Sequence, residues 1–319
     1  MPDTRPAILV LSDVHPHVAD TLKERFEVVV VERGERLAID AATAERIRAV
    51  ASAGAFKSAW MDQLPHLQLI ASFGVGYDGV DIAHAVARRI VVTNTPDVLN
   101  DEVADTTIGL LLNTIREFSK AEQWLRDGHW TGDGYRLSPF SLKGRHVGIF
   151  GLGRIGKEIA HRLAPFKVKI SYHTRTKHPD VAYDYFPTLK EMASAVDTLI
   201  AIVPKTAATH KIIDAEILSA LGPQGVLINV GRGWSVDEDA LIAALRDGTL
   251  GAAGLDVFYS EPHVPEALLA LPNATLFPHL GSSTVPTRRA MADLVAGNII
   301  HWFDSGNAIT PVPETPLKR

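Results

Sequence analysis

The stretch Gly151-Leu152-Gly153-Arg154-Ile155-Gly156 decides the fold class of this chain. The apolar run His146–Phe150 before it is typical of a buried strand, and Arg154–Leu163 after it predicts a helix. A second apolar strand, Val168–His173, completes a βαβ unit. Glycines at this spacing let the backbone turn tightly, approach a pyrophosphate and place it at the positive end of the helix. We therefore expect a dinucleotide at this turn, and a plain packing turn is the less favoured alternative.

The end of the second strand predicts which dinucleotide binds. NAD-binding units of this type usually carry an acidic residue there, which holds the ribose 2′-hydroxyl. This sequence instead reads His173-Thr174-Arg175-Thr176-Lys177-His178. Arg175 and Lys177 supply cations, and Thr174 and Thr176 supply hydroxyls, a set suited to a 2′-phosphate. We expect NADP(H) to be preferred, with NAD(H) still usable; a solvated basic loop without function is the alternative.

Short β-branched runs alternate with helical stretches along most of the chain, which indicates an α/β fold with parallel sheets. In the first third, the predicted strands are Ala7–Leu11, Glu27–Val31, Leu67–Ser72 and Ile90–Thr93, with Thr43–Ala51 predicted to be helical. In the second series, the predicted strands are His146–Phe150, Val168–His173, Thr198–Val203, Val226–Val230 and Ala252–Val257. We expect two Rossmann-like, doubly wound parallel-sheet domains with a cleft between them.

Two turn-prone segments predict the domain boundaries. Asn94–Asp97 leads into a long predicted helix, Asp101–Asp127, which Gly128 ends. Gly281–Ser283 precedes a last apolar helix, Arg288–Phe303, which is expected to return to the first domain. The prediction is a substrate-binding domain of residues 1–97 plus 287–319 and a dinucleotide-binding domain of residues 98–286, with hinges near Thr95 and Ser283.

Composition excludes several classes of function. The 319 residues are 46% hydrophobic and 22% charged, as in ordinary globular proteins. A net charge of -5 gives no general attraction to nucleic acid or to anionic lipid. With 0 cysteines, thiolate nucleophiles and cysteine-ligated metals are excluded, and no metal site is expected. No export signal or membrane span is visible, so the expected location is the cytoplasm.

Three loops that follow predicted strands carry the candidate catalytic residues. They are the segments Asn229–Gly233, Asp256–Pro262 and Phe277–Ser282. Reduction of a 2-keto acid needs a cation for the carboxylate, a proton donor for the carbonyl oxygen and a group that holds this donor. Arg232, His279 and Glu261 have the matching chemistry, although each of them alone also fits an ordinary structural role. Open α/β sheets bind their ligands at this edge.

Taken together, these motifs resemble the D-isomer-specific 2-hydroxyacid dehydrogenase family, and its glyoxylate/hydroxypyruvate reductase branch most of all. The resemblance covers nearly the whole chain. Its signatures are Gly74-Val75-Gly76-Tyr77-Asp78, Gly151–Gly156, Asn229–Leu241, Asp256–Pro262 and Pro278-His279. The resemblance implies that His279 is the acid/base, that Glu261 is its partner and that Arg232 binds the substrate carboxylate.

The resemblance also implies further binding residues. The backbone amides of Val75 and Gly76 would complete the carboxylate site, consistent with a glycine-rich turn whose amides face an anion. The implied cofactor contacts beyond Gly151–Gly156 and Thr174–Thr176 are Thr106, Val203, Pro204, Val230, Gly231, Arg232, Asp256, His279 and Gly281. Val203 and Asp256 equally fit a strand core residue and a strand-end cap.

The resemblance implies a homodimer formed through the nucleotide-binding domain, with the helix Asp101–Asp127 and the following loop at the interface. Trp130 then either reaches the partner's substrate pocket or anchors the interface. The expected function is an NADPH-preferring reductase of glyoxylate, hydroxypyruvate or related 2-keto acids, giving D-2-hydroxy acids. A nucleotide-sensing, co-repressor-like binding protein of the same fold is the alternative. Formate dehydrogenase is less favoured, because that branch pairs its histidine with glutamine where this chain has Glu261.

Overall fold

The computed structural model describes residues 5–315, which form two compact α/β units. Unit 1 contains the described residues 5–99 and 284–315, and unit 2 contains residues 100–283. The predicted boundaries, 97/98 and 286/287, lie within three residues of these divisions. The ends of the predicted first domain, residues 1–4 and 316–319, lie outside the described residues.

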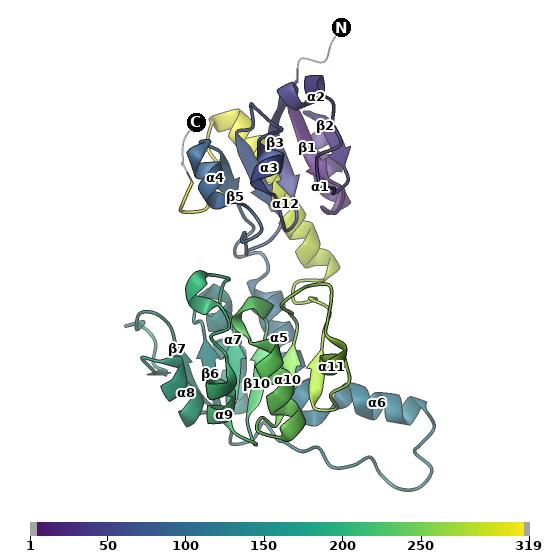
Figure 1. Ribbon diagram of the computed structural model, residues 1–319, viewed down its shortest axis with the longest axis vertical. Helices are drawn as coiled ribbons and strands as arrows, with labels where there is room; N and C mark the ends of the chain where they lie inside the picture. The colour runs from purple at the N-terminus through teal and green to yellow at the C-terminus, as the bar shows by residue number, and fades with distance from the viewer. Residues whose placement is uncertain (1–4, 316–319) are drawn as a thin grey trace. The chain divides into compact units, whose positions relative to one another are not determined.

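The core of unit 1 is a parallel sheet with the strand order β2-β1-β3-β4-β5 (Figure 1). Its strands are β1 (Ala7–Leu11), β2 (Glu27–Val31), β3 (Ile47–Ser52), β4 (Leu69–Ser72) and β5 (Val91–Thr93). Every residue of β1, β4 and β5 is buried, as expected of parallel strands that are covered on both faces.

Helices cover this sheet and include one from the far end of the chain. They are α1 (Pro16–Lys23), α2 (Ala41–Arg46), α3 (Ser58–Met61), α4 (Ile82–Ala87) and α12 (Val285–Ser305). Thr284 caps α12, which packs on α1, β3 and β4 through residues such as Val295 and Ile299. The predicted return of the last helix to the first unit is therefore correct. Neither α12 nor any other described helix is long and apolar enough to span a membrane.

The prediction of a helix over Thr43–Ala51 was wrong. The chain leaves α2 at Arg46 and continues directly as β3, which pairs with β1 on one side and with β4 on the other. The alanine-rich sequence has good helix propensity. Burial of Ile47, Val50 and their neighbours between two strands outweighs that local preference, because sheet propensity depends on tertiary context.

The sheet of unit 2 has the order β12-β11-β10-β9-β6-β7-β8. Its strands are β6 (His146–Phe150), β7 (Lys169–His173), β8 (Asp184–Tyr185), β9 (Thr198–Ala201), β10 (Val226–Asn229), β11 (Ala252–Leu255) and β12 (Ala274–Leu276). All neighbouring strands are parallel, and the short edge strands β8 and β12 were not predicted. The order reverses between β6 and β9, the topological switch point at which such sheets bind ligands.

Unit 2 is covered by α5 (Asn100–Arg116), α6 (Phe118–Arg126), α7 (Arg154–Leu163), α8 (Leu189–Ala195), α9 (Ala215–Leu221), α10 (Glu238–Asp247) and α11 (Glu266–Leu269). Successive strand residues belong to two different hydrophobic clusters. Ile149 and Ile200 pack in the cluster of α5 and α7, whereas Phe150 and Leu199 pack in that of α8, α9 and α10. This alternation shows helices on both faces, so the predicted doubly wound fold is confirmed.

The predicted long helix Asp101–Asp127 is two helices. Glu117 adopts the left-handed conformation with φ 56° and separates α5 from α6. Its side chain is only 5% exposed, and its Oε1 accepts hydrogen bonds from Lys120 at 3.1 Å and Arg136 at 2.7 Å. The ion pair with Arg136 is a tertiary contact that helical periodicity does not encode. Figure 1 shows α6 and the segment after it extending away from the sheet of unit 2.

Candidate active site

The glycine turn between β6 and α7 has no room for a side chain at its first and last glycines. Gly151 adopts φ 102°, and a Cβ atom there would lie 2.5 Å from the carbonyl oxygen of Ile202. A Cβ at Gly156 would lie 2.1 Å from the carbonyl oxygen of Gly151. Gly153 is the N-cap of α7 and has no side chain to bond the amides of the first turn. The turn therefore offers main-chain donors at the positive helix end, which fits a dinucleotide pyrophosphate.

The loops after β9 and β10 lie against this turn. A Cβ at Gly151 would approach Val203 Cγ1 to 3.0 Å, and one at Gly231 would lie 2.8 Å from the Val203 carbonyl oxygen. Pro204 follows Val203 in the chain, and Val230 precedes Gly231. The structure thus brings the expected residues Val203 and Gly231 together with the glycine turn at the switch point.

The loop after β7 holds the expected phosphate-binding residues. The Thr174 hydroxyl donates to the Thr176 carbonyl at 2.7 Å, and the Tyr185 hydroxyl donates to the Thr174 carbonyl at 3.2 Å. Arg175 and Lys177 are exposed, and neither forms an ion pair with any residue in the described part of the chain. The loop therefore presents two cations beside ordered backbone, which suits a phosphate group.

His279 and Glu261 form a hydrogen-bonded pair, as the sequence predicted for an acid/base and its partner. His279 Nδ1 lies 2.6 Å from Glu261 Oε2, and the Phe258 amide donates to Glu261 Oε1 at 2.9 Å. The side chains of His279 and Glu261 are 49% and 32% exposed. With Nδ1 bound to the carboxylate, Nε2 is the nitrogen that can exchange a proton with a ligand.

The environment of Glu261 favours its ionised form. Partial burial alone would raise the pKa of Glu261. The hydrogen bonds from His279 and the Phe258 amide, followed by the charges of His279 and Arg232, outweigh this effect and lower the pKa below its usual value. A carboxylate that stays charged can hold the histidine proton on Nδ1 and stabilise an imidazolium ring.

Asp256 holds the turn that presents His279. It is 2% exposed, and its two carboxylate oxygens accept hydrogen bonds from the amides of Leu280 at 2.8 Å and Gly281 at 2.9 Å. His279 itself has φ 50°, a conformation that is rare without glycine. Burial raises the pKa of Asp256, opposed by both amides and by the charge of His279. Asp256 therefore holds the turn after His279 in place, which agrees with the strand-end cap that the sequence analysis left open as an alternative to a cofactor contact.

Arg232 and Thr106 are held by hydrogen bonds within unit 2. The Arg232 side chain donates to the Gly231 carbonyl at 2.8 Å, and the Arg232 carbonyl accepts from Ser235 Oγ at 2.8 Å. Thr106 Oγ1 donates to the Gly281 carbonyl at 3.2 Å, which links α5 to the turn after His279. Unit 2 therefore contains Arg232, Glu261 and His279 on three of its loops.

The remaining expected substrate residues have different surroundings. Val75 and Gly76 follow β4 in unit 1, where Asn94 Nδ2 donates a hydrogen bond to the Val75 carbonyl at 2.8 Å. Trp130 lies in unit 2 after α6 and is 65% exposed. Within residues 5–315, no cluster of three or more His, Asp or Glu side chains is arranged to hold a metal ion.

Comparison with known proteins agrees with this geometry. The family model "D-isomer specific 2-hydroxyacid dehydrogenase, NAD binding domain" matches residues 108–281. Glyoxylate/hydroxypyruvate reductase A HPR2 of Arabidopsis thaliana is 43% identical over 309 residues, covering 96% of this chain and 98% of that protein. Hydroxyphenylpyruvate reductase of Plectranthus scutellarioides is 47% identical over 272 residues, covering 84% of this chain and 86% of that protein.

A solved structure matches over the full length. The NADPH-dependent glyoxylate/hydroxypyruvate reductase SmGhrB of Sinorhizobium meliloti, in complex with NADP and malonate, superimposes with a TM-score of 0.95 at 56% identity. The match covers 99% of each chain. The protein belongs to the D-isomer specific 2-hydroxyacid dehydrogenase family, and the resemblance found in its sequence is confirmed.

Proposed function

We propose that this protein is an NADPH-preferring reductase that converts small 2-keto acids of the glyoxylate and hydroxypyruvate type to D-2-hydroxy acids. The observation that carries the proposal is the His279–Glu261 pair, at 2.6 Å, in the same unit as a glycine turn that fits a dinucleotide. The names of the Arabidopsis and Sinorhizobium relatives, both glyoxylate/hydroxypyruvate reductases, support this substrate class.

The residues divide the chemistry among them. The bound cofactor supplies the hydride for the carbonyl carbon. Arg232 and the amides of Val75 and Gly76 bind the substrate carboxylate and orient the carbonyl group. His279 Nε2 donates the proton that the carbonyl oxygen takes up as it becomes a hydroxyl, and Glu261 stabilises the imidazolium before that transfer. One hydride and one proton thus complete the 2-hydroxy acid.

Several loops of unit 2 would hold the cofactor. The turn Gly151–Gly156 would bind the pyrophosphate, and Thr174, Arg175 and Thr176 would bind the 2′-phosphate. Val203, Pro204, Val230 and Gly231 would line the adenosine side, and Thr106, Asp256 and Gly281 would border the nicotinamide. The NADPH-dependent relative SmGhrB, whose structure contains NADP, supports the preference for the phosphorylated cofactor.

The two units have different proposed binding roles. Residues 1–97 with 287–319 would be the substrate-binding domain, and residues 98–286 would be the dinucleotide-binding domain. The family model for the NAD binding domain, which matches residues 108–281, supports the second assignment. A cleft between the domains and its closure remain predictions; a change in small-angle scattering on adding NADPH and oxalate would support them.

A rate measurement tests the function directly. Purified wild-type protein should oxidise NADPH with glyoxylate or hydroxypyruvate, and more slowly with NADH. A chain that binds both cofactors without turning over any 2-keto acid would contradict the reductase assignment. That result would favour the nucleotide-sensing alternative. The presence of Arg232, Glu261 and His279 together argues against this alternative. The cytoplasmic location stays a prediction, to be tested by cell fractionation.

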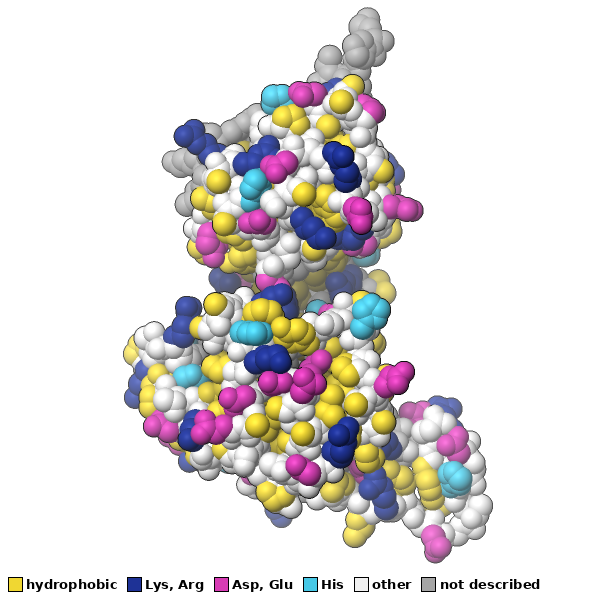
Figure 2. Space-filling view, in the orientation of Figure 1, with side chains coloured by type: hydrophobic (Ala, Val, Ile, Leu, Met, Phe, Trp, Pro, Cys, Tyr) yellow, Lys and Arg dark blue, Asp and Glu magenta, His cyan; other side chains and the backbone are white. Residues whose placement is uncertain are grey.

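The arm of unit 2, residues 117–137, supports a homodimer. No residue of α6 is buried, and Phe118, Trp130 and Leu137 are 50%, 65% and 92% exposed. Hydrophobic and charged side chains are mixed over this segment in Figure 2. Exposed apolar side chains on a protruding element favour contact with another chain. Trp130 would lie in that interface, either as an anchor or at the partner's substrate pocket.

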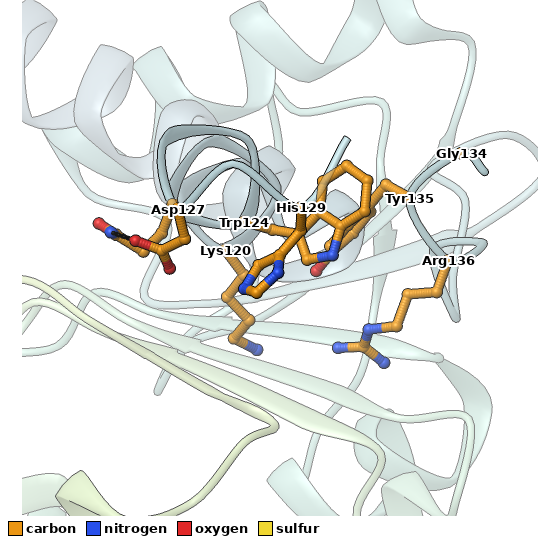
Figure 3. A pocket seen from close by; sticks show the side chains of 8 residues that line it. Lys120, Trp124, Asp127, His129, Gly134, Tyr135 and Arg136 are labelled. Carbon is orange, nitrogen blue, oxygen red and sulfur yellow. Dashed lines mark hydrogen bonds between the residues drawn. The ribbon is translucent and has the colours of Figure 1, made fainter. Parts of the chain in front are cut away.

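The inner side of the arm is hollowed. A cavity of about 430 Å³ is lined by Lys120, Gln123, Trp124, Asp127, His129, Gly134, Tyr135 and Arg136 (Figure 3). The Trp124 ring meets Tyr135 edge-on at 5.5 Å and His129 at 6.1 Å, which gives the arm a small folded core. Leu137→Asp should shift the sedimentation coefficient toward the monomer. A monomeric wild-type protein would contradict the dimer.

A further inference from the structure

Three aromatic side chains form a triangular cluster beside the candidate catalytic loops of unit 2. They are His210, Trp234 and Tyr259, together called the aromatic ladder. The ring centroids of His210 and Trp234 are 3.9 Å apart at an interplanar angle of 32°, and those of Trp234 and Tyr259 are 5.7 Å apart at 13°. Lys205 Nζ lies 4.6 Å from the Trp234 centroid, and Lys211 Nζ lies 5.7 Å from that of Tyr259. Ring–ring contacts and cation–π attraction both favour this cluster.

The aromatic ladder connects the loops that follow three adjacent strands, β9, β10 and β11. Trp234 Nε1 donates a hydrogen bond to the Thr206 carbonyl at 2.9 Å, and the Lys211 amide donates to the Trp234 carbonyl at 2.9 Å. His210 Nε2 and the Tyr259 hydroxyl lie 3.1 Å apart. Each ring is thus tied to a loop other than its own, and Trp234 contacts both of the other rings.

Two members of the ladder are close neighbours in sequence of the proposed catalytic residues. Trp234 follows Arg232 by two positions, and Tyr259 precedes Glu261 by two positions. Between them the backbones are in close contact, since a Cβ at Gly233 would lie 1.9 Å from the Phe258 carbonyl carbon. The Trp234 ring is thus packed next to a close backbone contact between the loop that carries Arg232 and the loop that carries Glu261.

Ionisable groups surround the ladder on every side that the loops contact. Besides Lys205 and Lys211, Asp237 accepts a hydrogen bond from Lys211 Nζ at 3.3 Å, and Glu238 accepts one from the Tyr259 amide at 2.7 Å. These bonds tie the start of α10 to the same loops. Lys205 and Lys211 thus lie over rings, Lys211 also pairs with Asp237, and Glu238 holds a main-chain amide.

We infer that the aromatic ladder is a positioning element, which sets the place of Arg232 relative to the Glu261–His279 pair. The inference rests on the proposed function, because it assigns a purpose to the same catalytic residues. A positioning role predicts that loss of Trp234 changes the catalytic step and its pH dependence while cofactor affinity is kept. A role in the adenosine site predicts the reverse.

The test compares Trp234→Ala and Trp234→Phe with the wild-type protein, and uses Phe166→Ala as the control. Phe166 is an exposed ring of the same unit, 42% exposed, outside the catalytic and binding loops. The readouts are kcat and KM for hydroxypyruvate from about pH 5 to pH 9, and the Kd for NADPH from fluorescence titration. The melting temperature reports on folding.

We expect Trp234→Ala to lower kcat/KM at least about tenfold and to move one limb of its pH profile, with the NADPH Kd within about twofold of wild type. Trp234→Phe keeps a stacking ring and should return to within about threefold of wild type, and Phe166→Ala should match wild type. A wild-type protein without activity would contradict the proposed function rather than the positioning role.

Three results would overturn the positioning role in an active wild-type background. One is unchanged kinetics in Trp234→Ala. Another is a loss of activity that follows the melting temperature and leaves the pH profile unmoved, which shows a merely structural role. The last is a raised NADPH Kd at unchanged kcat, which assigns the ladder to the cofactor site.

Discussion

The two units contain the same kind of side-chain pair in different surroundings. In unit 1, His84 Nε2 lies 2.7 Å from Asp62 Oδ1; in unit 2, His279 Nδ1 lies 2.6 Å from Glu261 Oε2. Asp62 is 59% exposed, whereas Glu261 is 32% exposed and also accepts a main-chain hydrogen bond. A histidine–carboxylate pair alone is therefore no sign of catalysis. Two features distinguish the pair in unit 2. The second carboxylate oxygen of Glu261 accepts a main-chain hydrogen bond, and both residues lie on loops that follow strands.

The carboxyl ends of the strands show the same contrast. In unit 1 the turn Gly74–Gly76 after β4 offers main-chain groups, and the Asp13–Arg33 ion pair lies after β1 and β2. In unit 2 the charged side chains include Asp256, which holds the amides of Leu280 and Gly281, and Glu261, which holds the Phe258 amide. Recognition of a carboxylate requires only donors, whereas proton transfer requires a titratable group in a fixed orientation.

The largest expected effect is that of His279→Ala. Removal of a general acid lowers kcat by roughly 10²- to 10⁴-fold. His84→Ala, which removes the histidine of the matching pair in unit 1, should leave kcat unchanged. Initial rates of NADPH oxidation with hydroxypyruvate measure both variants. Equal losses in the two would mean that the pair in unit 2 has no special role.

Arg232→Ala should have the next largest effect, mainly on KM for the 2-keto acid. A hydrogen bond to a charged group contributes about 1.5–3 kcal/mol, so KM should rise about tenfold to a hundredfold. Arg232→Lys keeps the charge without the bidentate geometry and should recover only part of the loss. If KM stays the same in Arg232→Ala, the substrate carboxylate is bound elsewhere, and the turn in unit 1 becomes the main candidate.

Arg175→Ala should change cofactor preference. Loss of one charged contact to a 2′-phosphate should lower kcat/KM for NADPH by about tenfold or more and leave NADH use nearly unchanged. Lys143→Ala removes an exposed cation elsewhere in unit 2 and serves as the control. Equal losses with NADPH and NADH would falsify the assignment of Arg175 to the phosphate.

The smallest expected effect is on stability and depends on pH. The folded-state pKa of Glu261 lies below its ordinary value of 4.5, so its ionised form stabilises the fold above that pH. This contribution is lost as the pH falls through the folded-state pKa. Glu261→Gln should therefore lower the free energy of unfolding most at neutral pH, and progressively less in acid. Urea unfolding at a series of pH values measures this.

Glu45→Gln is the matched control for that experiment. Glu45 also contacts a histidine, His66, at 3.0 Å, but it lies in unit 1 and its side chain is 61% exposed. Exposed pairs contribute little to stability, so the variant should behave like wild type at every pH. A pH-independent loss in Glu261→Gln would show that packing, rather than charge, is what the substitution removes.

Sequence reasoning succeeded where local pattern and chemistry agree. The glycine turn and the strands beside it were found from spacing and residue type, and Arg232, Glu261 and His279 became candidates through their chemistry and the family resemblance. It failed at β3, where an alanine-rich segment with helical propensity is buried between two strands. It also failed at Glu117, where an ion pair with the distant Arg136 accompanies the break between α5 and α6. In both cases long-range contacts outweigh a local preference.

Asp256 and Trp234 show how the same division applies to the site. The family resemblance made Asp256 a candidate, yet only the folded chain shows its carboxylate on the amides of Leu280 and Gly281. Nothing in the sequence marks Trp234, because its neighbours His210 and Tyr259 are distant along the chain. Periodicity and motifs specify the βαβ plan and the chemical groups, since these depend on neighbouring residues. Which groups meet, and in which orientation, is decided by tertiary packing, because the partners come from separate loops.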